Sequence, residues 1–238
     1  MGLIVISAGL ATAASEAAAG PWPRGKGHFF ASVAWSSWGD LLGYYDALQE
    51  TFVEAPQLTT TEELTFFAEY GVTDRVTVGV DSHRRPEEES GANIWFVRAT
   101  VGPRDWSSQY AVELGLGNGR SYTGETDTVT RAAFLWGRGF STFGIDGWAD
   151  VNARVESLAG TEDVLYKVDS TFGVKPDDKR LIYIQMQSGK LGENPGFTRV
   201  VPTYVRNFGP HLSLESAFLY GIENDDSLGV KFGVWTQF

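Results

Sequence analysis

Apolar and polar residues alternate along most of this chain, and the final stretch shows the pattern most clearly. In residues 228–238, apolar side chains occupy every second position, with Thr236 as the interruption. The apolar set is Leu228, Val230, Phe232, Val234 and Phe238. Successive side chains of a β-strand point to opposite faces, so this stretch predicts a strand with one apolar face and one more polar face.

Eleven earlier segments alternate in the same way and are separated by turn or loop signals. The predicted strands cover residues 29–35, 63–70, 75–81, 94–101, 109–116, 130–136, 143–155, 164–174, 181–187, 197–205, 212–220 and 228–238. The run 83–91 is too polar for a strand and predicts a solvated loop. Gly137 and Gly139 predict a short turn before the strand that begins at Phe143.

The predicted connections alternate in length along the chain. Those at 71–74, 102–105, 137–141, 175–179 and 208–210 are short, whereas most of the others are longer. Twelve is an even number of strands, as in single-chain bacterial barrels, which also segregate short periplasmic turns from longer outer loops. A soluble all-β domain has no reason to sort its loops in this way.

The closing strand resembles that of bacterial outer-membrane β-barrels, which typically ends in a C-terminal phenylalanine read by the barrel-assembly machinery. That resemblance implies an assembly signal made by Phe232, Val234 and Phe238, with the assembly machinery as a partner. The predicted fold class is all-β, a single closed antiparallel transmembrane β-barrel of about twelve strands. Outer-membrane lipids and lipopolysaccharide are its expected surroundings, and the cell outer membrane is its expected location.

One hairpin supports a narrower resemblance. Residues 71–80, preceded by Phe67 to Tyr70, look like hairpins in a family of small barrels assigned as transporters of the meta-pathway of phenol degradation. The resemblance is close over this hairpin and architectural over the rest of the chain. It implies a role in moving small, aromatic or mildly apolar solutes across the outer membrane.

The N-terminal residues have the features of a secretory signal. Residues 3–11 form a short apolar core and residues 17–19 offer a small-residue cleavage site, although no Lys or Arg precedes the core. The expected organisation is a signal peptide at 1–19, a periplasmic N-terminal linker at 20–27 and the outer-membrane barrel at 28–238.

If the apolar parity meets lipid, the opposite parity lines the lumen, because a charge on the lipid face costs roughly 2–4 kcal/mol near the midplane. The predicted lumen-lining residues are Glu63, Glu69, Asp81, Arg98, Glu113, Arg131, Asp146, Trp148, Asp150, Asn152, Arg154, Lys167, Asp169, Glu215 and Lys231. In segment 197–206 the apolar residues Val200, Val201 and Val205 do not share one parity, so its inward face is not predicted. The inward charges allow two interpretations, a structural network that holds the barrel shut and a polar channel. Inward Phe67, Trp148, Tyr183 and Trp235 suit an aromatic or mildly apolar solute, or simply fill space.

The amino-acid composition excludes several kinds of chemistry and of partner. The chain has no cysteine, which excludes disulfides and thiol chemistry, and its net charge of −11 argues against a nucleic-acid partner. His211 and Ser213 have a His-x-Ser spacing that resembles outer-membrane lipases and lipid deacylases, but the Asn-Gly that follows in the lipase pattern is missing. The spacing of His, Asp and Glu predicts no metal site, and no cofactor is expected.

The sequence therefore predicts a non-enzymatic outer-membrane channel or passive transporter for small solutes. The main alternative is a closed structural or adhesion barrel whose outward loops, with Tyr44, Tyr45 and the run 83–91, contact a partner. A lipid hydrolase that uses His211 and Ser213 is the third hypothesis.

Overall fold

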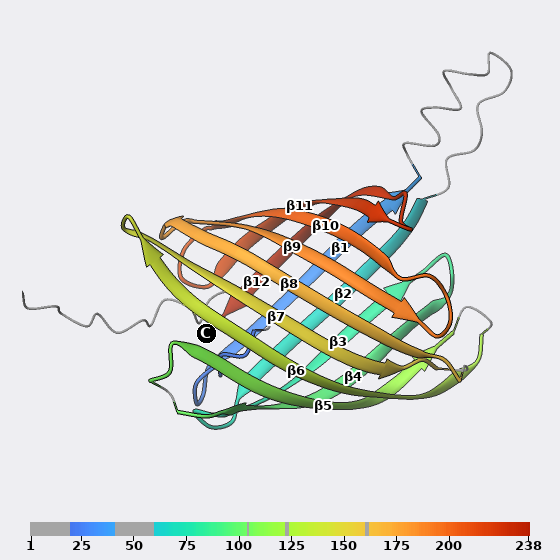
Figure 1. Ribbon diagram of the computed structural model, residues 1–238, viewed down its shortest axis with the longest axis horizontal. Coiled ribbons are helices and arrows are strands. Elements are labelled where there is room, and N and C mark those ends of the chain that lie inside the picture. Colours follow the sequence, from blue (N-terminus) through green and yellow to red (C-terminus); the bar gives the residue numbers. More distant parts are fainter. Residues whose placement is uncertain (1–19, 41–59, 104, 122–123, 160–161) are drawn as a thin grey trace, which may run out of the picture.

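The computed structural model describes residues 20–238 except 41–59, 104, 122–123 and 160–161. Its strands form one closed antiparallel barrel, in which each strand pairs with its neighbours in sequence and the first pairs with the last (Figure 1). The predicted closed barrel and its twelve strands are confirmed. Within the described ranges, no helix is long and apolar enough to cross a membrane.

The strands are longer than the sequence pattern predicts at several ends. They are β1 (Phe29–Gly39), β2 (Thr60–Gly71), β3 (Val76–Arg85), β4 (Ser90–Val101), β5 (Ser108–Arg120), β6 (Thr126–Thr142), β7 (Ile145–Ser157), β8 (Val164–Asp177), β9 (Arg180–Leu191), β10 (Phe197–Asn207), β11 (Leu212–Glu223) and β12 (Leu228–Gln237).

Two predicted connections are wrong. The run 83–91 is not one loop, because β3 continues to Arg85 and β4 begins at Ser90. Its polarity misled the prediction: Arg85 faces inward and its Nε pairs with Glu63 of β2 at 3.1 Å. The turn expected at 137–141 lies instead at Phe143 and Gly144, after β6 has run to Thr142.

The turn between β6 and β7 has a clear backbone signature. Phe143 and Gly144 both have positive φ, 54° and 76°, as a two-residue hairpin turn of type I′ requires. Phe143 is fully exposed at the tip, so it is not the first outward residue of a strand. Gly137 lies within β6, where a Cβ atom would come 2.6 Å from the ring of Trp22.

An irregularity lies beside β10, the strand whose sequence shows no clear parity. The register of β10 against β11 shifts between Thr198 and Arg199. Beyond the shift, Val201, Thr203 and Val205 are buried inside the barrel, while Tyr204 is exposed outside. The extra residue at this shift is Ile222 of β11, and β10 pairs with β9 without interruption. The inward face of β10 therefore keeps one parity, which the sequence obscures because Val201 and Val205 are apolar side chains that fill the lumen.

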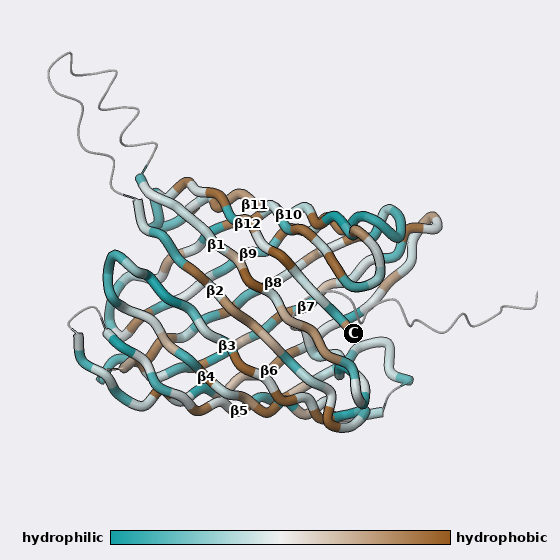
Figure 2. Tube along the Cα trace, turned by 180° about the vertical axis from the view of Figure 1, so that it is seen from behind, coloured by the Kyte–Doolittle hydropathy of each residue, from teal (hydrophilic) through white to brown (hydrophobic). Residues whose placement is uncertain are grey.

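The outer face of the barrel is an apolar belt. Trp95, Leu114, Leu116 and Phe218 are each at least 60% exposed, and hydrophobic stretches recur along the strands around the barrel (Figure 2). A water-soluble monomer rarely exposes apolar surface on this scale. Hydrocarbon is the solvent that covers such a belt, so the barrel is of the transmembrane type.

The two ends of the barrel differ. The short connections 72–75, 143–144, 178–179 and 208–211, with the described residues 102–103 and 105–107, lie at one end, here called the turn end (Figure 1). The start of β1 and the end of β12 lie there too. Phe29 and Phe238 exchange backbone hydrogen bonds of 2.9 and 3.0 Å at this end, which completes the closure. Phe232, Val234 and Phe238 point outward and are about half exposed. The opposite end is the loop end.

An outward charge should destabilise this barrel. Replacing Leu114, 69% exposed in β5, by Arg should lower the free energy of unfolding from lipid vesicles by about 2–4 kcal/mol, because the guanidinium would sit in hydrocarbon. Urea titrations of the Leu114→Arg and Leu114→Ala proteins measure the effect of charge apart from lost contacts. Equal stability of the two variants would contradict a lipid-facing belt.

Candidate functional site

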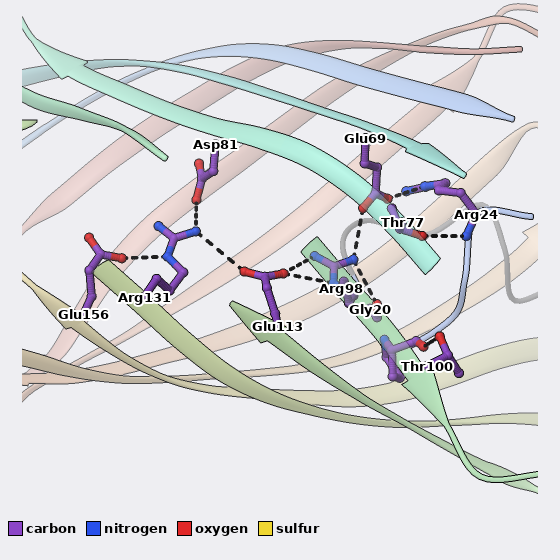
Figure 3. Close-up of polar contacts among 11 residues, drawn as sticks. Gly20, Arg24, Glu69, Thr77, Asp81, Arg98, Thr100, Glu113, Arg131 and Glu156 are labelled. Carbon is purple, nitrogen blue, oxygen red and sulfur yellow. Dashed lines mark hydrogen bonds and ion pairs between the residues drawn. The ribbon is translucent and has the colours of Figure 1, made fainter. Parts of the chain in front are cut away.

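Residues 20–24 enter the turn end of the barrel, while Lys26 and Gly27, which lead into β1, are exposed. Pro21 is fully buried, and the backbone carbonyls of Gly20 and Pro21 accept hydrogen bonds from Arg98 Nη1 at 3.2 Å and Thr100 Oγ1 at 2.9 Å. The guanidinium of Arg24 pairs with Glu69 on β2 (Figure 3). The segment expected to be a simple linker, residues 20–27, therefore places residues 20–24 in the lumen, and the whole segment is called the N-terminal segment below.

Glycine allows this segment to enter closely against the wall. A Cβ atom on Gly71, at the end of β2, would lie 1.7 Å from the carbonyl oxygen of Gly25. Gly27 N donates to Gly71 O at 2.8 Å, and Gly71 N donates to His28 O at 2.9 Å. A side chain at position 71 would push the N-terminal segment away from the barrel wall.

Aromatic and aliphatic side chains fill the lumen beside the N-terminal segment. The buried members are Phe30, Trp148, Leu181, Val205 and Trp235, with Trp22, Phe67 and Tyr183 packed against them. Phe30 meets Trp235 edge to face, with ring centroids 5.8 Å apart. These side chains and the N-terminal segment close the turn end, and they are called the aromatic closure below.

A ladder of ion pairs continues from Arg24 along the inner wall (Figure 3). Arg98 bridges Glu69 at 3.0 Å and Glu113 at 2.8 Å. Arg131 bridges Asp81 at 2.7 Å and Glu156 at 2.8 Å, and its Nη1 is 4.0 Å from Glu113. Apart from Asp81, these side chains are buried. Each acid touches a guanidinium, so the ladder satisfies its own charges.

Strand register explains how residues distant in sequence meet in this ladder. Arg98 of β4 is directly opposite Glu113 of β5, and Arg131 of β6 is opposite Glu156 of β7. Directly opposed residues of an antiparallel pair have their Cβ atoms about 4.5–5.5 Å apart. Once the inward parity is set, the register alone brings each arginine to its acid.

On the opposite wall, Glu215 of β11 is buried with several donors around it. Tyr183 Oη donates to it at 2.9 Å, Lys231 Nζ at 3.0 Å and Trp235 Nε1 at 3.1 Å. A buried carboxylate with this many donors is structurally satisfied. This group ties the aromatic closure to β11 and β12.

A cavity of about 180 Å³ lies in the lumen between the ladder and β7 to β9. Its wall combines charged, polar and aromatic side chains. The lining residues are Phe67, Asp81, Arg98, Glu113, Arg131, Trp148, Asp150, Asn152, Arg154, Asp169, Thr171, Tyr183 and Gln185.

The charges on the β7–β8 side of this cavity are held less tightly than the ladder. Asp169 is 3.9 Å from Arg154 Nη2 and 3.4 Å from Lys167 Nζ. The buried atoms Asn152 Oδ1, Arg154 Nε and Asp169 Oδ1 have no hydrogen-bond partner among the described residues. Buried polar atoms are normally paired, so these atoms mark the part of the lumen best suited to a ligand or water.

The predicted lumen residues fall into distinct groups. Glu69, Arg98, Glu113, Arg131 and Asp81 meet in the ladder. The cavity is lined by Trp148, Asp150, Asn152, Arg154 and Asp169, and Lys167 pairs with Asp169. Glu63 lies apart, paired with Arg85 toward the loop end, and Asp146 is exposed next to the β6–β7 turn. The sequence pattern did not identify Arg24 as a lumen residue, because Arg24 lies outside the strands and strand alternation cannot assign its side chain to a face.

The His-x-Ser pair does not form a hydrogen bond. His211 Nδ1 lies 2.7 Å from the carbonyl oxygen of Gln237, and Ser213 Oγ donates to Asn207 Oδ1 at 2.8 Å. Both residues lie at the turn end. Among the described residues, no group of three or more His, Asp or Glu side chains could hold a metal ion.

At the loop end, Asp225 in the β11–β12 loop pairs with Arg199 of β10 at 2.7 Å. Partial burial opposes ionisation of this carboxyl group. Hydrogen bonds from Ser227 and the charge of Arg199 outweigh that effect and lower the pKa of Asp225 below its ordinary value. Arg199 and Arg85 both stack on Trp38, 5.4 and 5.7 Å from its ring, so cations and an aromatic ring gather at this mouth.

Comparison with known proteins gives a fold likeness. No family model matches the chain, and no curated protein matches it significantly. An outer membrane channel from Pseudomonas putida F1 is similar in structure with a TM-score of 0.59 at 11% identity, covering 90% of this chain and 96% of the channel. Omp33 from Acinetobacter baumannii gives a TM-score of 0.49 at 9% identity, covering 90% of this chain and all of that protein.

At such identities the likeness concerns the fold, which is that of outer-membrane β-barrels. The closed barrel, its apolar belt and this likeness together support a location in the outer membrane. The narrower resemblance of residues 67–80 to the phenol meta-pathway family stays a prediction.

Removing one cation from the ladder should lower the stability of the barrel substantially. Replacing Arg98 by Met leaves Glu69 and Glu113 buried, so stability should fall by about 3–5 kcal/mol. Replacing Arg85 by Met breaks a pair whose arginine is 41% exposed, and should cost about 0–1 kcal/mol. Denaturant titrations in detergent measure both variants, and similar losses would contradict a structural role for the buried ladder.

Proposed function

We propose that this protein is an outer-membrane channel or passive transporter for small solutes, closed at the turn end in the described conformation. The observation that carries the proposal is the charged cavity of about 180 Å³ inside the barrel. The proposal includes export through a signal at residues 1–19, which lie outside the described residues. It also includes assembly through the C-terminal strand in a lipopolysaccharide-containing membrane.

A purely structural core gives little reason for this cavity. Buried ion pairs contribute little net stability compared with well-packed apolar side chains, because desolvation offsets their attraction. The ladder is self-satisfied, but the β7–β8 side leaves three buried polar atoms without partners next to open space. Unpaired polar atoms around a cavity favour passage or binding of a polar solute over a sealed core.

The cavity wall also bears on the kind of solute. Phe67, Trp148 and Tyr183 contribute aromatic surface beside the carboxylates and arginines. A small molecule with an apolar or aromatic body and at least one polar group matches this mixture. The fold likeness to an outer membrane channel agrees with the proposal without specifying a solute.

A continuous path requires the aromatic closure to move. The N-terminal segment is held by the pair of Arg24 with Glu69 and by the hydrogen bonds of Arg98 and Thr100 to its carbonyl groups. Strand pairing holds the barrel wall far more extensively than these contacts hold the segment. The N-terminal segment is therefore the element proposed to shift when the channel opens.

The alternative is a closed structural or adhesion barrel. The continuous ladder and the aromatic closure favour it, since both cross-link the inner wall. In that case outward loops carry the function. Tyr44 and Tyr45, named from the sequence for such a role, lie outside the described residues.

Conductance measured through planar bilayers distinguishes a channel from a closed structural barrel. The Arg24→Ser protein should show an open-to-closed ratio at least about tenfold higher than the unaltered protein, because the closed state loses a charge-assisted contact worth about 1.5–3 kcal/mol. Lys26→Ser is the matched control, because Lys26 lies in the same segment and is exposed.

Equal opening of the two variants would contradict the N-terminal segment as the gate. Absence of any conductance in the unaltered and both variant proteins, with normal heat-modifiable migration on gels, would contradict the channel and favour the closed barrel.

A further inference from the structure

The cavity has one carboxylate that no cation neutralises directly. Asp81 and Glu113 contact arginines of the ladder, whereas no ion pair joins Asp150 to a Lys, Arg or His side chain of the described residues. Asp150 lies in hydrogen-bonding reach of Thr171 and Trp148, and the charged group that acts on it is another acid, Asp169. A buried carboxylate without a counter-charge is costly, so a cation from outside would be favoured here.

Two further acceptors lie next to Asp150. Asn152 follows two residues later on the same face of β7, and Asp169 of β8 is directly opposite Asn152 in the register. Asn152 Oδ1 and Asp169 Oδ1 are both buried without hydrogen-bond partners among the described residues. Three neighbouring acceptors therefore face the cavity, and a primary ammonium group carries three N–H donors in a compact arrangement.

Aromatic rings flank the acceptors. Trp148 precedes Asp150 by two residues on the same inner face, and its ring centroid is 6.1 Å from that of Tyr183. Phe67 completes the aromatic side of the cavity wall. Aromatic faces attract cations and also cover apolar surface. Arg154 and Lys167 both approach Asp169 Oδ2, which leaves Asp169 Oδ1 for an incoming cation.

The size of the cavity agrees with this arrangement. Its lining includes four acids, Asp81, Glu113, Asp150 and Asp169, and three arginines, Arg98, Arg131 and Arg154. Because Lys167 beside Asp169 supplies a fourth cation, the preference for a cation rests on the position of Asp150 and not on net charge. An apolar cavity of about 150 Å³ accommodates benzene. A volume of about 180 Å³ is therefore suited to one ring with a short ammonium-bearing chain.

We propose that this cavity binds small organic cations, with a primary ammonium group held by Asp150, Asn152 and Asp169 and an apolar body against Trp148, Tyr183 and Phe67. This inference rests on the proposed channel function and names the class of solute that the same lumen accepts.

A series of probes of matched shape tests the inference on the unaltered protein. The probes are 2-phenylethylammonium, neutral 2-phenylethanol and anionic 3-phenylpropionate, titrated calorimetrically into the purified full-length barrel in non-ionic detergent at pH 7.5. The ammonium probe should bind at least about tenfold more tightly than the alcohol, because only it supplies a charged donor. The carboxylate probe should bind no better than the alcohol.

A substitution locates the site. Asp150→Asn removes the charge while keeping the size and polarity of the side chain, and it should weaken binding of 2-phenylethylammonium by at least about tenfold. Asp178→Asn is the matched control, because Asp178 is exposed in the β8–β9 turn and its variant should bind as the unaltered protein does. Heat-modifiable migration confirms that each variant is folded.

Three results would overturn the inference: no binding of the ammonium probe, equal or tighter binding of the alcohol or carboxylate, or unchanged binding in folded Asp150→Asn protein. Bilayer conductance measured on the same preparation keeps the two proposals apart. Conductance without ammonium selectivity rejects the solute class and leaves the channel standing, whereas ammonium binding without conductance rejects the channel and leaves the binding site.

Discussion

Backbone hydrogen bonding in hydrocarbon is the constraint on which this structure depends. No water is available there to satisfy exposed N–H and C=O groups, so a sheet that spans a membrane must close on itself. The pairing of β1 with β12, completed by the mutual hydrogen bonds of Phe29 and Phe238, removes the last free edges. Closure then divides every strand into a lipid face and a lumen face.

The division places the charged residues in a confined space with little water. Acids and arginines on neighbouring strands meet at the registered positions, as Arg98 does with Glu113 and Arg131 with Glu156. Where each acid contacts a guanidinium, as in the ladder, the wall satisfies its own charges. No such contact is made by Asp150 within the described residues, and the cavity lies beside it. The pairing of charges along the inner wall thus distinguishes the scaffold from the candidate site.

Much of the fold could be predicted, because a two-residue period is visible in a single sequence. Predictions failed where polarity was mistaken for a loop, as at Arg85, or glycine for a turn, as at Gly137. Arg85 is polar because its strand faces the lumen beside Glu63, and Gly137 is small because Trp22 and Pro21 lie against it. In both cases the reason is a contact with a residue distant in the chain.

The sequence by itself determined the strands, their number and the inward parity of residues such as Glu69, Asp150 and Lys231, since these follow from local alternation and the cost of charge in lipid. Only the tertiary structure decided which charges are paired, that residues 20–24 enter the lumen, and that a cavity remains beside Asp150. Those outcomes depend on strand register and on the volume left between side chains of opposite walls. Neither quantity is encoded in any local stretch, because each is set by the closed barrel as a whole.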